Sequence, residues 1–316
     1  MRIAYIITAY QDPEQLYSTV SALTHESCDF YIHIDKKVDI SPFISVCLRL
    51  KNVSRITWIE NRQWICWGGW SQVKSILKLL EKVFLSKLEY DRIVCISGTD
   101  YPIYSNEQII TEFEKHPFKQ YLMGLNVSNC QIEDIKQKIN RYWFFDFKIR
   151  NLFILRFIIG KINGFFVTRL INFFIKKDVH SLLNGKQVDI YFGSDYWALT
   201  YECAKYLYQV AINEKLLMKY LEFCFVPSEL FVHTILYNSE YRDQCELIEE
   251  PYYEELQSVT PLHYIDIKYP FKVQELDESY FKELLKSKKM FFRKASSVKS
   301  NELIKLINEI RCIKGN

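Results

Sequence analysis

Short apolar runs alternate with amphipathic segments through the first 116 residues, and this alternation constrains the fold more than any other feature. Each run is rich in β-branched residues and is followed by a polar loop, which is typical of buried strands. Strands that alternate with helices predict an α/β fold with a mostly parallel sheet. The predicted strands cover residues 2–10, 30–37, 55–60 and 90–103, and the predicted helices cover residues 14–24, 69–85 and 105–116.

Ligands of such sheets bind at the carboxyl ends of the strands. That rule selects Tyr10, Asp35 and the loop SGTDYP, which contains Asp100. Either aspartate can instead be a turn residue that bonds its own backbone. The strand ends carry single carboxylates rather than an Asp-x-Asp pair, which commonly holds a divalent ion against a diphosphate. The sequence therefore does not support metal-dependent phosphate chemistry, and we expect no metal site.

Glu229 follows Pro227 and Ser228 at the start of a predicted helix, in the stretch VPSELFVHTIL. Ser228 can cap such a helix, and an acidic residue in the first turn complements the helix dipole. The same position keeps a carboxylate ionised and ready to accept a proton. The two interpretations, helix-start residue and general base, are compatible.

Two further motifs each have a structural and a functional interpretation. The stretch WICWGGW places Trp64, Trp67 and Trp70 around a Gly-Gly step. Such rings stack on sugars or bases, although core packing is expected for Trp70. Arg293 and Lys294 follow two phenylalanines. They are either a solvated face or a cation pair that neutralises a departing diphosphate in place of a metal.

The formal net charge of +3 argues against a nucleic-acid binder that works by bulk electrostatics. Charge is uneven, however, because residues 148–177 are apolar, carry Lys and Arg at roughly helical intervals and contain no acid. This segment is either an amphipathic surface that rests on anionic lipid or a helical insertion whose apolar face is core. The sequence leaves both interpretations open.

The nine cysteines lack CxxC or CxxxC spacing, so the sequence predicts neither a zinc site nor a disulfide framework. Apolar neighbours around Cys66, Cys95 and Cys224 favour buried thiols in a reducing compartment. The run MRIAYIITAY is too short for a signal peptide. No run of about 20 apolar residues predicts a transmembrane helix. The expected location is the cytoplasm.

Together these motifs resemble the core-2/I-branching N-acetylglucosaminyltransferase and peptide O-xylosyltransferase family, in a short bacterial form. The combination that carries the resemblance is SGTDYPI with a downstream Asn, then YFGSDYWALT, then VPSELFVHTIL. The other blocks that recur in the same order are IAYIITAYQDPEQL, YIHIDKK, WGGWSQVKSILKLL, INRYWFF and FFRKA.

The resemblance implies a GT-A-like glycosyltransferase with a mixed, mostly parallel central sheet flanked by helices. We expect one catalytic domain over residues 1–316. Its parts are a nucleotide-binding half (1–125), an acceptor and catalytic half (126–295) and a C-terminal helix (296–316). The family is inverting and metal-independent. The resemblance therefore implies no metal and no other cofactor, and a UDP-sugar as donor substrate.

The resemblance also assigns the reacting groups. Glu229 matches the base that deprotonates the acceptor hydroxyl, and Lys294 matches the lysine that stabilises the leaving diphosphate. The family has an arginine in the preceding strand, where His263 stands here. Either Arg293 supplies that charge from the next position or His263 acts as an imidazolium, with Lys268 a weaker candidate.

Other positions match binding residues of the family. Ser228 replaces the aspartate that usually precedes the base, and we expect it to remain a competent cap. On the donor side, the resemblance implies Asp35 as an acid near the nucleoside and Tyr10 as a polar residue of the first loop. It also implies Trp67 as an aromatic beside the nucleotide and Asp100 as an acid at a strand end. On the acceptor side it implies Arg141, Tyr142 and Trp197.

The sequence therefore predicts transfer of GlcNAc or xylose from a UDP-sugar to a glycan or lipid-linked glycan, in surface polysaccharide synthesis. The expected location is cytoplasmic, and the lipid-facing interpretation of residues 148–177 would add peripheral contact at the inner face of the membrane. One alternative is a non-catalytic sugar- or nucleotide-binding module that keeps the fold. Another is a glycoside hydrolase, which needs two carboxylates about 5 to 10 Å apart, and the sequence offers no clear partner for Glu229.

Overall fold

The structure is a computed structural model of the whole chain. The predicted lipid-facing segment 148–177 lies outside the residues that it describes, apart from Lys177, so neither interpretation of that segment is tested. The described residues are 1–50, 55–127, 130–131, 133–146, 177, 188–249, 259–268 and 272–314.

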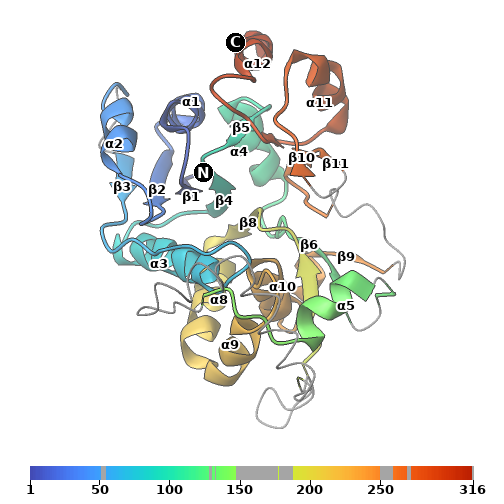
Figure 1. Cartoon of the computed structure of the whole chain (residues 1–316). Coiled ribbons are helices and arrows are strands. Elements are labelled where there is room, and N and C mark those ends of the chain that lie inside the picture. The colour runs from blue at the N-terminus through green and yellow to red at the C-terminus, as the bar shows by residue number, and fades with distance from the viewer. Residues whose placement is uncertain are drawn as a thin grey trace.

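A five-stranded sheet forms the centre of the molecule, in the order β3-β2-β1-β4-β8 (Figure 1). The first four strands are parallel, and β8 runs antiparallel to β4 with Cys95 opposite Trp197. The predicted α/β fold with a mixed, mostly parallel sheet is therefore confirmed. The strands are β1 (Ile3–Ala9), β2 (Cys28–Ile34), β3 (Ile56–Trp58), β4 (Arg92–Ser97) and β8 (Trp197–Thr200).

Successive side chains of β1 point to opposite faces of the sheet, as in any strand, and belong to two separate cores. Ala4 and Ile6 pack in one core with α3, α8 and α10, whereas Tyr5 and Ile7 pack in the other with α1, α2 and α4. The sheet is thus covered on both faces (Figure 1). These helices are α1 (Pro13–Leu23), α2 (Ser41–Cys47), α3 (Ser71–Leu85), α4 (Asn106–Lys115), α8 (Tyr201–Asn213) and α10 (Ser228–Tyr237).

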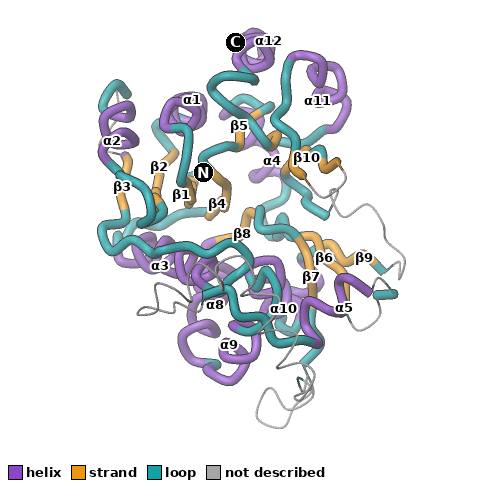
Figure 2. The backbone as a smooth tube through the Cα atoms, viewed as in Figure 1, coloured by secondary structure: helices purple, strands orange, loops and turns teal. Residues whose placement is uncertain are grey.

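Two three-stranded sheets extend this framework, and they lie on opposite sides of β8 in the view of Figure 2. In the β10-β13-β5 sheet, Arg293 pairs with Asp100, so a C-terminal strand meets the end of the predicted strand at residues 90–103. The strands are β5 (Asp100–Pro102), β10 (His263–Ile265) and β13 (Phe291–Arg293), and, in the β7-β6-β9 sheet, β6 (Met123–Asn126), β7 (Tyr191–Gly193) and β9 (Glu246–Ile248).

The remaining elements lie around these sheets. A short hairpin joins β11 (Ile267–Lys268) to β12 (Lys272–Val273). The other helices are α5 (Glu133–Asn140), α9 (Lys215–Glu222), α11 (Phe281–Ser287) and α12 (Asn301–Lys314), with single 3-10 turns at Arg242–Gln244 and Glu278–Tyr280.

Helix α10 begins differently from the prediction. Its N-cap is Pro227, and Ser228 is the first helical residue, with a buried side chain that makes no capping hydrogen bond. The expectation that Ser228 caps the helix is therefore wrong, because a proline with its fixed φ already starts the turn one residue earlier. Glu229 does lie in the first turn, as predicted.

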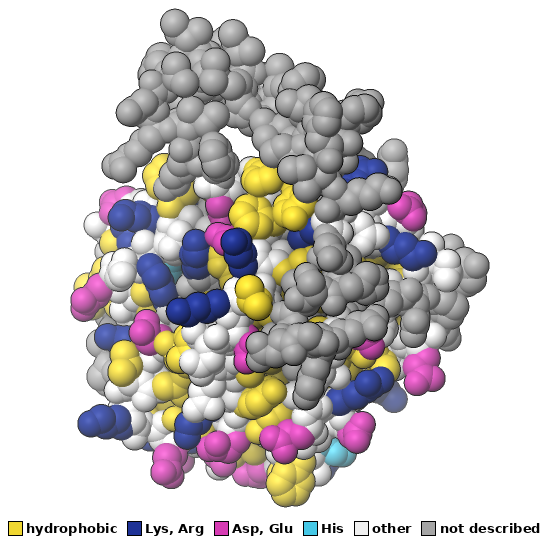
Figure 3. Space-filling model, turned by 90° about the horizontal axis from the view of Figure 1, so that it is seen from below, with side chains coloured by type: hydrophobic (Ala, Val, Ile, Leu, Met, Phe, Trp, Pro, Cys, Tyr) yellow, Lys and Arg dark blue, Asp and Glu magenta, His cyan; other side chains and the backbone are white. Residues whose placement is uncertain are grey.

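Surface features agree with the low net charge. Lys and Arg are interspersed with Asp and Glu over the described part of the face shown in Figure 3. No helix in the described part of the chain is long and apolar enough to cross a membrane. Each cysteine whose side chain the structure describes is a free thiol, and most are buried.

Candidate active site

The carboxyl edge of the central sheet collects residues from four segments. Tyr10 and Asp35 directly follow β1 and β2, and the loop after β4 leads to Asp100. Because β8 is antiparallel to its neighbour, its first residues lie at this same edge, which places Asp195 and Tyr196 there too. The topology thus gathers three of the predicted site residues, Tyr10, Asp35 and Asp100, at one edge.

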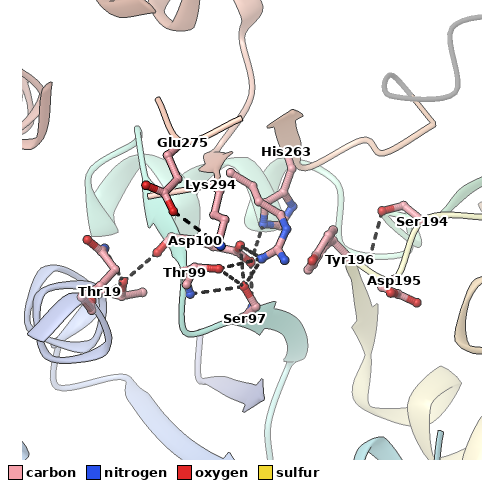
Figure 4. Close-up of polar contacts among 12 residues, drawn as sticks. Thr19, Ser97, Thr99, Asp100, Ser194, Asp195, Tyr196, His263, Glu275 and Lys294 are labelled. Carbon is pink, nitrogen blue, oxygen red and sulfur yellow. Dashed lines mark hydrogen bonds and ion pairs between the residues drawn. The ribbon is translucent and has the colours of Figure 1, made fainter. Parts of the chain in front are cut away.

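Asp100 organises a buried cluster at this edge (Figure 4). Its Oδ2 accepts from the Ser97 backbone N–H at 2.7 Å and contacts His263 Nε2 at 3.1 Å. Its Oδ1 accepts from the Ser97 hydroxyl at 2.7 Å and from Arg293 Nη1 at 2.8 Å. Burial alone would raise the pKa of Asp100, but His263 and Arg293 reverse this effect and hold it at about 2.

A direct donor contact by Asp100 is therefore corrected, because both carboxylate oxygens are already used inside the protein. Asp100 is a positioning residue that fixes the Arg293 side chain. The interpretation as a turn residue also holds, since it bonds the backbone of Ser97 three residues earlier.

The alternative in which His263 supplies a positive charge is also corrected. The ring is buried between Phe291, at 5.2 Å between centroids, and Tyr196, at 4.5 Å. Burial lowers the pKa of His263, although the facing Asp100 raises it, and the ring's Nε2 is bonded to Asp100 and not open to a ligand. The buried His263 ring therefore stabilises the Asp100 cluster and does not contact a ligand.

Arg293 is the member of this cluster that remains partly open, with 19% of its side chain exposed. Its Nη1 donates to Ser97, Thr99 and Asp100, and its guanidinium lies over the Tyr196 ring at 5.0 Å. Burial opposes its charge, but Tyr196, Asp100 and Tyr10 together raise the pKa of Arg293. It is a fixed cation at the edge.

Lys294 lies beside this cluster in Figure 4. Its ammonium is 3.7 Å from Glu275 Oε1, and the Lys294 side chain is 18% exposed. A diphosphate that binds Lys294 must therefore compete with Glu275, which is itself well exposed. Lys268, the weaker candidate, is exposed on β11 and pairs with Asp266 at 3.7 Å.

Glu229 forms the second half of the site. Its Oε2 accepts from Lys138 Nζ at 2.5 Å, and 27% of its side chain is exposed. The Lys138 ammonium also lies 4.2 Å from the centre of the Phe192 ring. Lys138 was missed from sequence, because nothing in the sequence of α5 shows that this lysine meets a residue 91 positions away.

Asp195 connects the two halves and was also missed from sequence. Gln72 Nε2 donates to its Oδ2 at 3.0 Å, and the buried Ser228 hydroxyl acts on the carboxylate through a hydrogen bond that lowers its pKa. Burial and the charge of Glu229 raise the pKa of Asp195 to about 6, against the lowering effects of Ser228, Arg293 and Lys138. The sequence signal that could have identified Asp195 is an acid in a Gly-Ser turn directly before a strand.

The remaining donor candidates differ in exposure. Asp35 is buried and accepts from the backbone N–H groups of Lys37, at 2.9 Å, and Ile65, at 3.3 Å. Its Oδ2 also pairs with the Lys37 ammonium at 3.2 Å, so the structure shows the turn role for Asp35. Tyr10 is exposed and lies close enough to act on the charge of Arg293.

The predicted acceptor residues separate into two groups. Arg141 is exposed, and Tyr142 is partly buried with its ring stacked on Phe144. Trp197 is 0% exposed and belongs to the core beneath β8, so its acceptor role is corrected. Side chains on that face of β8 point into the core and cannot meet a ligand. Trp67, by contrast, is 73% exposed.

The described ranges contain no group of three His, Cys, Asp or Glu side chains placed to hold a metal ion. The prediction of metal-independent chemistry stays a prediction.

Comparison with known proteins gives a consistent family. A sequence model of the family described as Core-2/I-Branching enzyme matches residues 3–247. Xylosyltransferase 2 from Mus musculus and from Homo sapiens are each 24% identical over 251 residues, which is 76% of this chain and 25% of the relative. A xylosyltransferase from Ciona intestinalis is 22% identical over 257 residues, 78% of this chain and 26% of the relative. The chain spans about a quarter of the length of these relatives.

Similarity to solved structures is weaker. Mouse xyloside xylosyltransferase 1 in its apo form gives a TM-score of 0.35 at 9% identity, covering 78% of this chain and 85% of that one. A putative glucose-1-phosphate thymidylyltransferase from Bacillus anthracis gives 0.33 at 12% identity, covering 78% and 87%. Scores this low do not locate the site, which rests on its own geometry.

Proposed function

The chain belongs to the core-2/I-branching enzyme family, and from that premise we propose that it is an inverting glycosyltransferase. It moves a sugar from a UDP-sugar to a hydroxyl of a glycan, with Glu229 as base. The cations Arg293 and Lys294 stabilise the leaving diphosphate.

One observation carries this proposal. The charges of Glu229 and Arg293 both act on Asp195, the first raising its pKa and the second lowering it. Arg293 also lies over the ring of Tyr196, the residue after Asp195, at 5.0 Å. We therefore take the candidate base and the candidate cation to lie on two sides of Asp195. A single displacement needs that arrangement, because the acceptor attacks opposite the leaving group.

Every bond and proton of the proposed reaction can be accounted for with these residues. Glu229 takes the proton of the acceptor hydroxyl as its oxygen bonds the anomeric carbon. The bond from that carbon to the phosphate oxygen breaks on the opposite side, and UDP leaves with the electron pair. Positioned proton removal is worth about 10²- to 10⁴-fold in rate. Lys138 holds the Glu229 carboxylate in one place at 2.5 Å until the acceptor enters.

Fixed cations act on the leaving group. Arg293 is held by Ser97, Thr99 and Asp100, so it costs no reorganisation when charge develops on the diphosphate. Lys294 adds a second, more mobile charge once Glu275 releases it. This pair is the reason to propose that the reaction proceeds without a metal.

The curated relatives carry the name xylosyltransferase, which supports a pentose donor, and the resemblance to N-acetylglucosaminyltransferases of the same family supports an amino-sugar donor. We therefore place UDP-xylose and UDP-GlcNAc first among donors, with a surface glycan or lipid-linked glycan as acceptor. Polysaccharide synthesis in the cytoplasm, at the inner face of the membrane, is the setting that fits such an acceptor. Contact with lipid through residues 148–177 is part of this proposal and is not needed for the chemistry.

A donor screen tests the proposal most directly. Bound UDP and the correct UDP-sugar should raise the melting temperature by mass action, equally with and without EDTA. The same preparation should then hydrolyse or transfer the sugar from that donor. Loss of the UDP shift in EDTA would contradict metal-independent binding.

The non-catalytic alternative makes a different prediction in the same experiment. A binding module would show the UDP-sugar shift but would neither transfer nor hydrolyse the sugar with any acceptor. A glycoside hydrolase would cleave glycosides without any nucleotide. Asp195, whose pKa is raised by the charge of Glu229, is a candidate for the second carboxylate of such an enzyme, so cleavage of p-nitrophenyl glycosides is a necessary control.

A further inference from the structure

Three chain segments are joined beside Glu229 by backbone hydrogen bonds. The Val226 N–H donates to the Gly68 carbonyl at 3.1 Å, and the Phe225 N–H donates to the Lys138 carbonyl at 2.9 Å. Ser71 completes the joint, since its hydroxyl donates to an Asp146 carboxylate oxygen at 2.6 Å. The loop before α3, the α5 region and the loop before α10 are therefore one fixed unit.

Aromatic side chains cover one surface of this unit. The Trp67 ring packs edge-on against Phe225, at 5.6 Å between centroids, and against Phe145, at 6.4 Å. Trp143 stacks on Phe145 at 5.9 Å and contacts Phe225 at 4.8 Å. We name these four rings, Trp67, Trp143, Phe145 and Phe225, the aromatic platform.

The tryptophans of the WICWGGW stretch have different environments. Trp70 is buried and packs against Phe231 at 6.1 Å, which confirms the core prediction for it. Trp67 remains largely exposed although two rings support it. Gly68 makes this possible, because its φ of +77° turns the chain in a way that L side chains rarely adopt. Ring contacts therefore hold Trp67 in place while most of its surface stays open to a ligand.

The platform is continuous with the proposed base. Phe225 lies 5.7 Å beneath the Lys138 ammonium, and Lys138 pairs with Glu229 at 2.5 Å. The fixed cation Arg293, in contrast, belongs to the buried Asp100 cluster on the β10-β13-β5 sheet. The ring of Trp67 is thus linked to the group that activates the acceptor.

From this geometry we infer that Trp67 is an acceptor subsite that stacks a pyranose ring of the glycan, in place of the nucleotide contact suggested by sequence. The inference rests on the proposed function and adds the class of acceptor. A pyranose has an apolar C–H face that matches an indole, while its equatorial hydroxyls project sideways. Lys138 and Glu229 then bind those hydroxyls. One sugar therefore contacts both the flat indole of Trp67 and the polar groups beside it.

Saturation-transfer NMR on the full chain with saturating UDP tests the inference, using lactose and cellobiose as probes. We expect saturation on the C–H protons of one pyranose face in the wild type. Trp67→Ala should weaken disaccharide binding by about tenfold, and Trp67→Phe by less, because a smaller ring remains. The UDP dissociation constant should not change in either variant.

Phe118→Ala is the matched control. This aromatic is 78% exposed, but it lies beside Lys119 at the amino end of β4, on the opposite edge of the sheet. Its removal should leave disaccharide binding unchanged, and equal melting temperatures of the variants should show that each is folded.

Other outcomes overturn the inference. Weaker UDP binding in Trp67→Ala would return this residue to the donor side. Saturation of a serine-glycine peptide in place of the disaccharides would make the platform a peptide site. Absence of any disaccharide saturation in the wild type would remove the sugar subsite. Failure of the proposed function itself is separate, because it would appear as loss of UDP binding and of donor hydrolysis in the wild type.

Discussion

Two carboxylate–cation pairs of the proposed site differ in how completely they are satisfied. Asp100 and Arg293 are 2.8 Å apart in a buried cluster where both carboxylate oxygens have partners. Glu229 and Lys138 are 2.5 Å apart but partly exposed, at 27% and 16% of their side chains. The first arrangement builds shape, and the second leaves a carboxylate available to a ligand.

This difference explains why similar residue types have different roles. In the Asp100 cluster a fixed charge is valuable because it orients Arg293 without taking part in the reaction. At Glu229 the single ion pair is weak enough for an acceptor hydroxyl to displace it, since partly exposed pairs contribute little. Substitutions in and around the two pairs test this contrast, and the largest effect is expected at the base.

Glu229→Gln should cause the largest loss. Removal of the base is expected to lower kcat by about 10²- to 10⁴-fold and to leave the UDP dissociation constant nearly unchanged. Steady-state kinetics and calorimetric titration with UDP measure the two quantities. Wild-type turnover in the variant would show that Glu229 is only a helix-start residue.

Asp100→Asn should act on stability instead. The change leaves Arg293 without its buried counter-charge, which we expect to cost about 2–4 kcal/mol in urea denaturation at pH 7. Because the native pKa of Asp100 is held at about 2, below its ordinary value of 3.8, its contribution is present above pH 4 and is lost as the pH falls toward 2.

The difference in stability between wild type and Asp100→Asn should therefore shrink below pH 4. Glu229→Gln is the matched comparison and should change the free energy of unfolding by less than about 1 kcal/mol. Equal destabilisation by the two variants would remove the contrast between the two pairs.

Features that depend on topology alone could be predicted from the sequence. Parallel strands place their carboxyl ends together, so Tyr10, Asp35 and Asp100 could be assigned to one edge before any coordinates. The sequence could not show that β13 pairs with β5, and that pairing buries the Asp100 carboxylate behind Arg293. It is also the reason why His263 supports the cluster and does not meet a ligand.

Two other residues show a different limit. Lys138 and Asp195 carry no motif of their own, and their importance comes from proximity to Glu229 across the fold. Trp197 stands next to Tyr196, yet the alternation of a strand turns its ring into the core. Residue type and order therefore predict the edge, whereas the side that each residue faces depends on packing.

Asp195→Asn should stabilise the protein, and only at higher pH. The native pKa of Asp195 is raised to about 6 from 3.8, so above pH 6 the folded chain carries a disfavoured charge that is absent below pH 4. We expect a gain of about 1–2 kcal/mol at pH 8 that disappears by pH 4, reduced from the full shift because Asp195 is only partly buried. A gain independent of pH would mean that the effect comes from packing and not from charge.

Lys138→Met should have the smallest effect and separates positioning from simple ion pairing. The methionine keeps an apolar stem over the Phe192 and Phe225 rings but removes the ammonium that holds Glu229. If that ammonium only adds surface stability, the free energy of unfolding should fall by at most about 1 kcal/mol and kcat should not change. If it positions the base, kcat should fall by about threefold to tenfold with an unchanged UDP dissociation constant, and Lys138→Arg should restore most of the rate because it keeps the charge. We expect the second result, because an incompletely satisfied carboxylate needs one fixed neighbour to keep its geometry before the acceptor arrives.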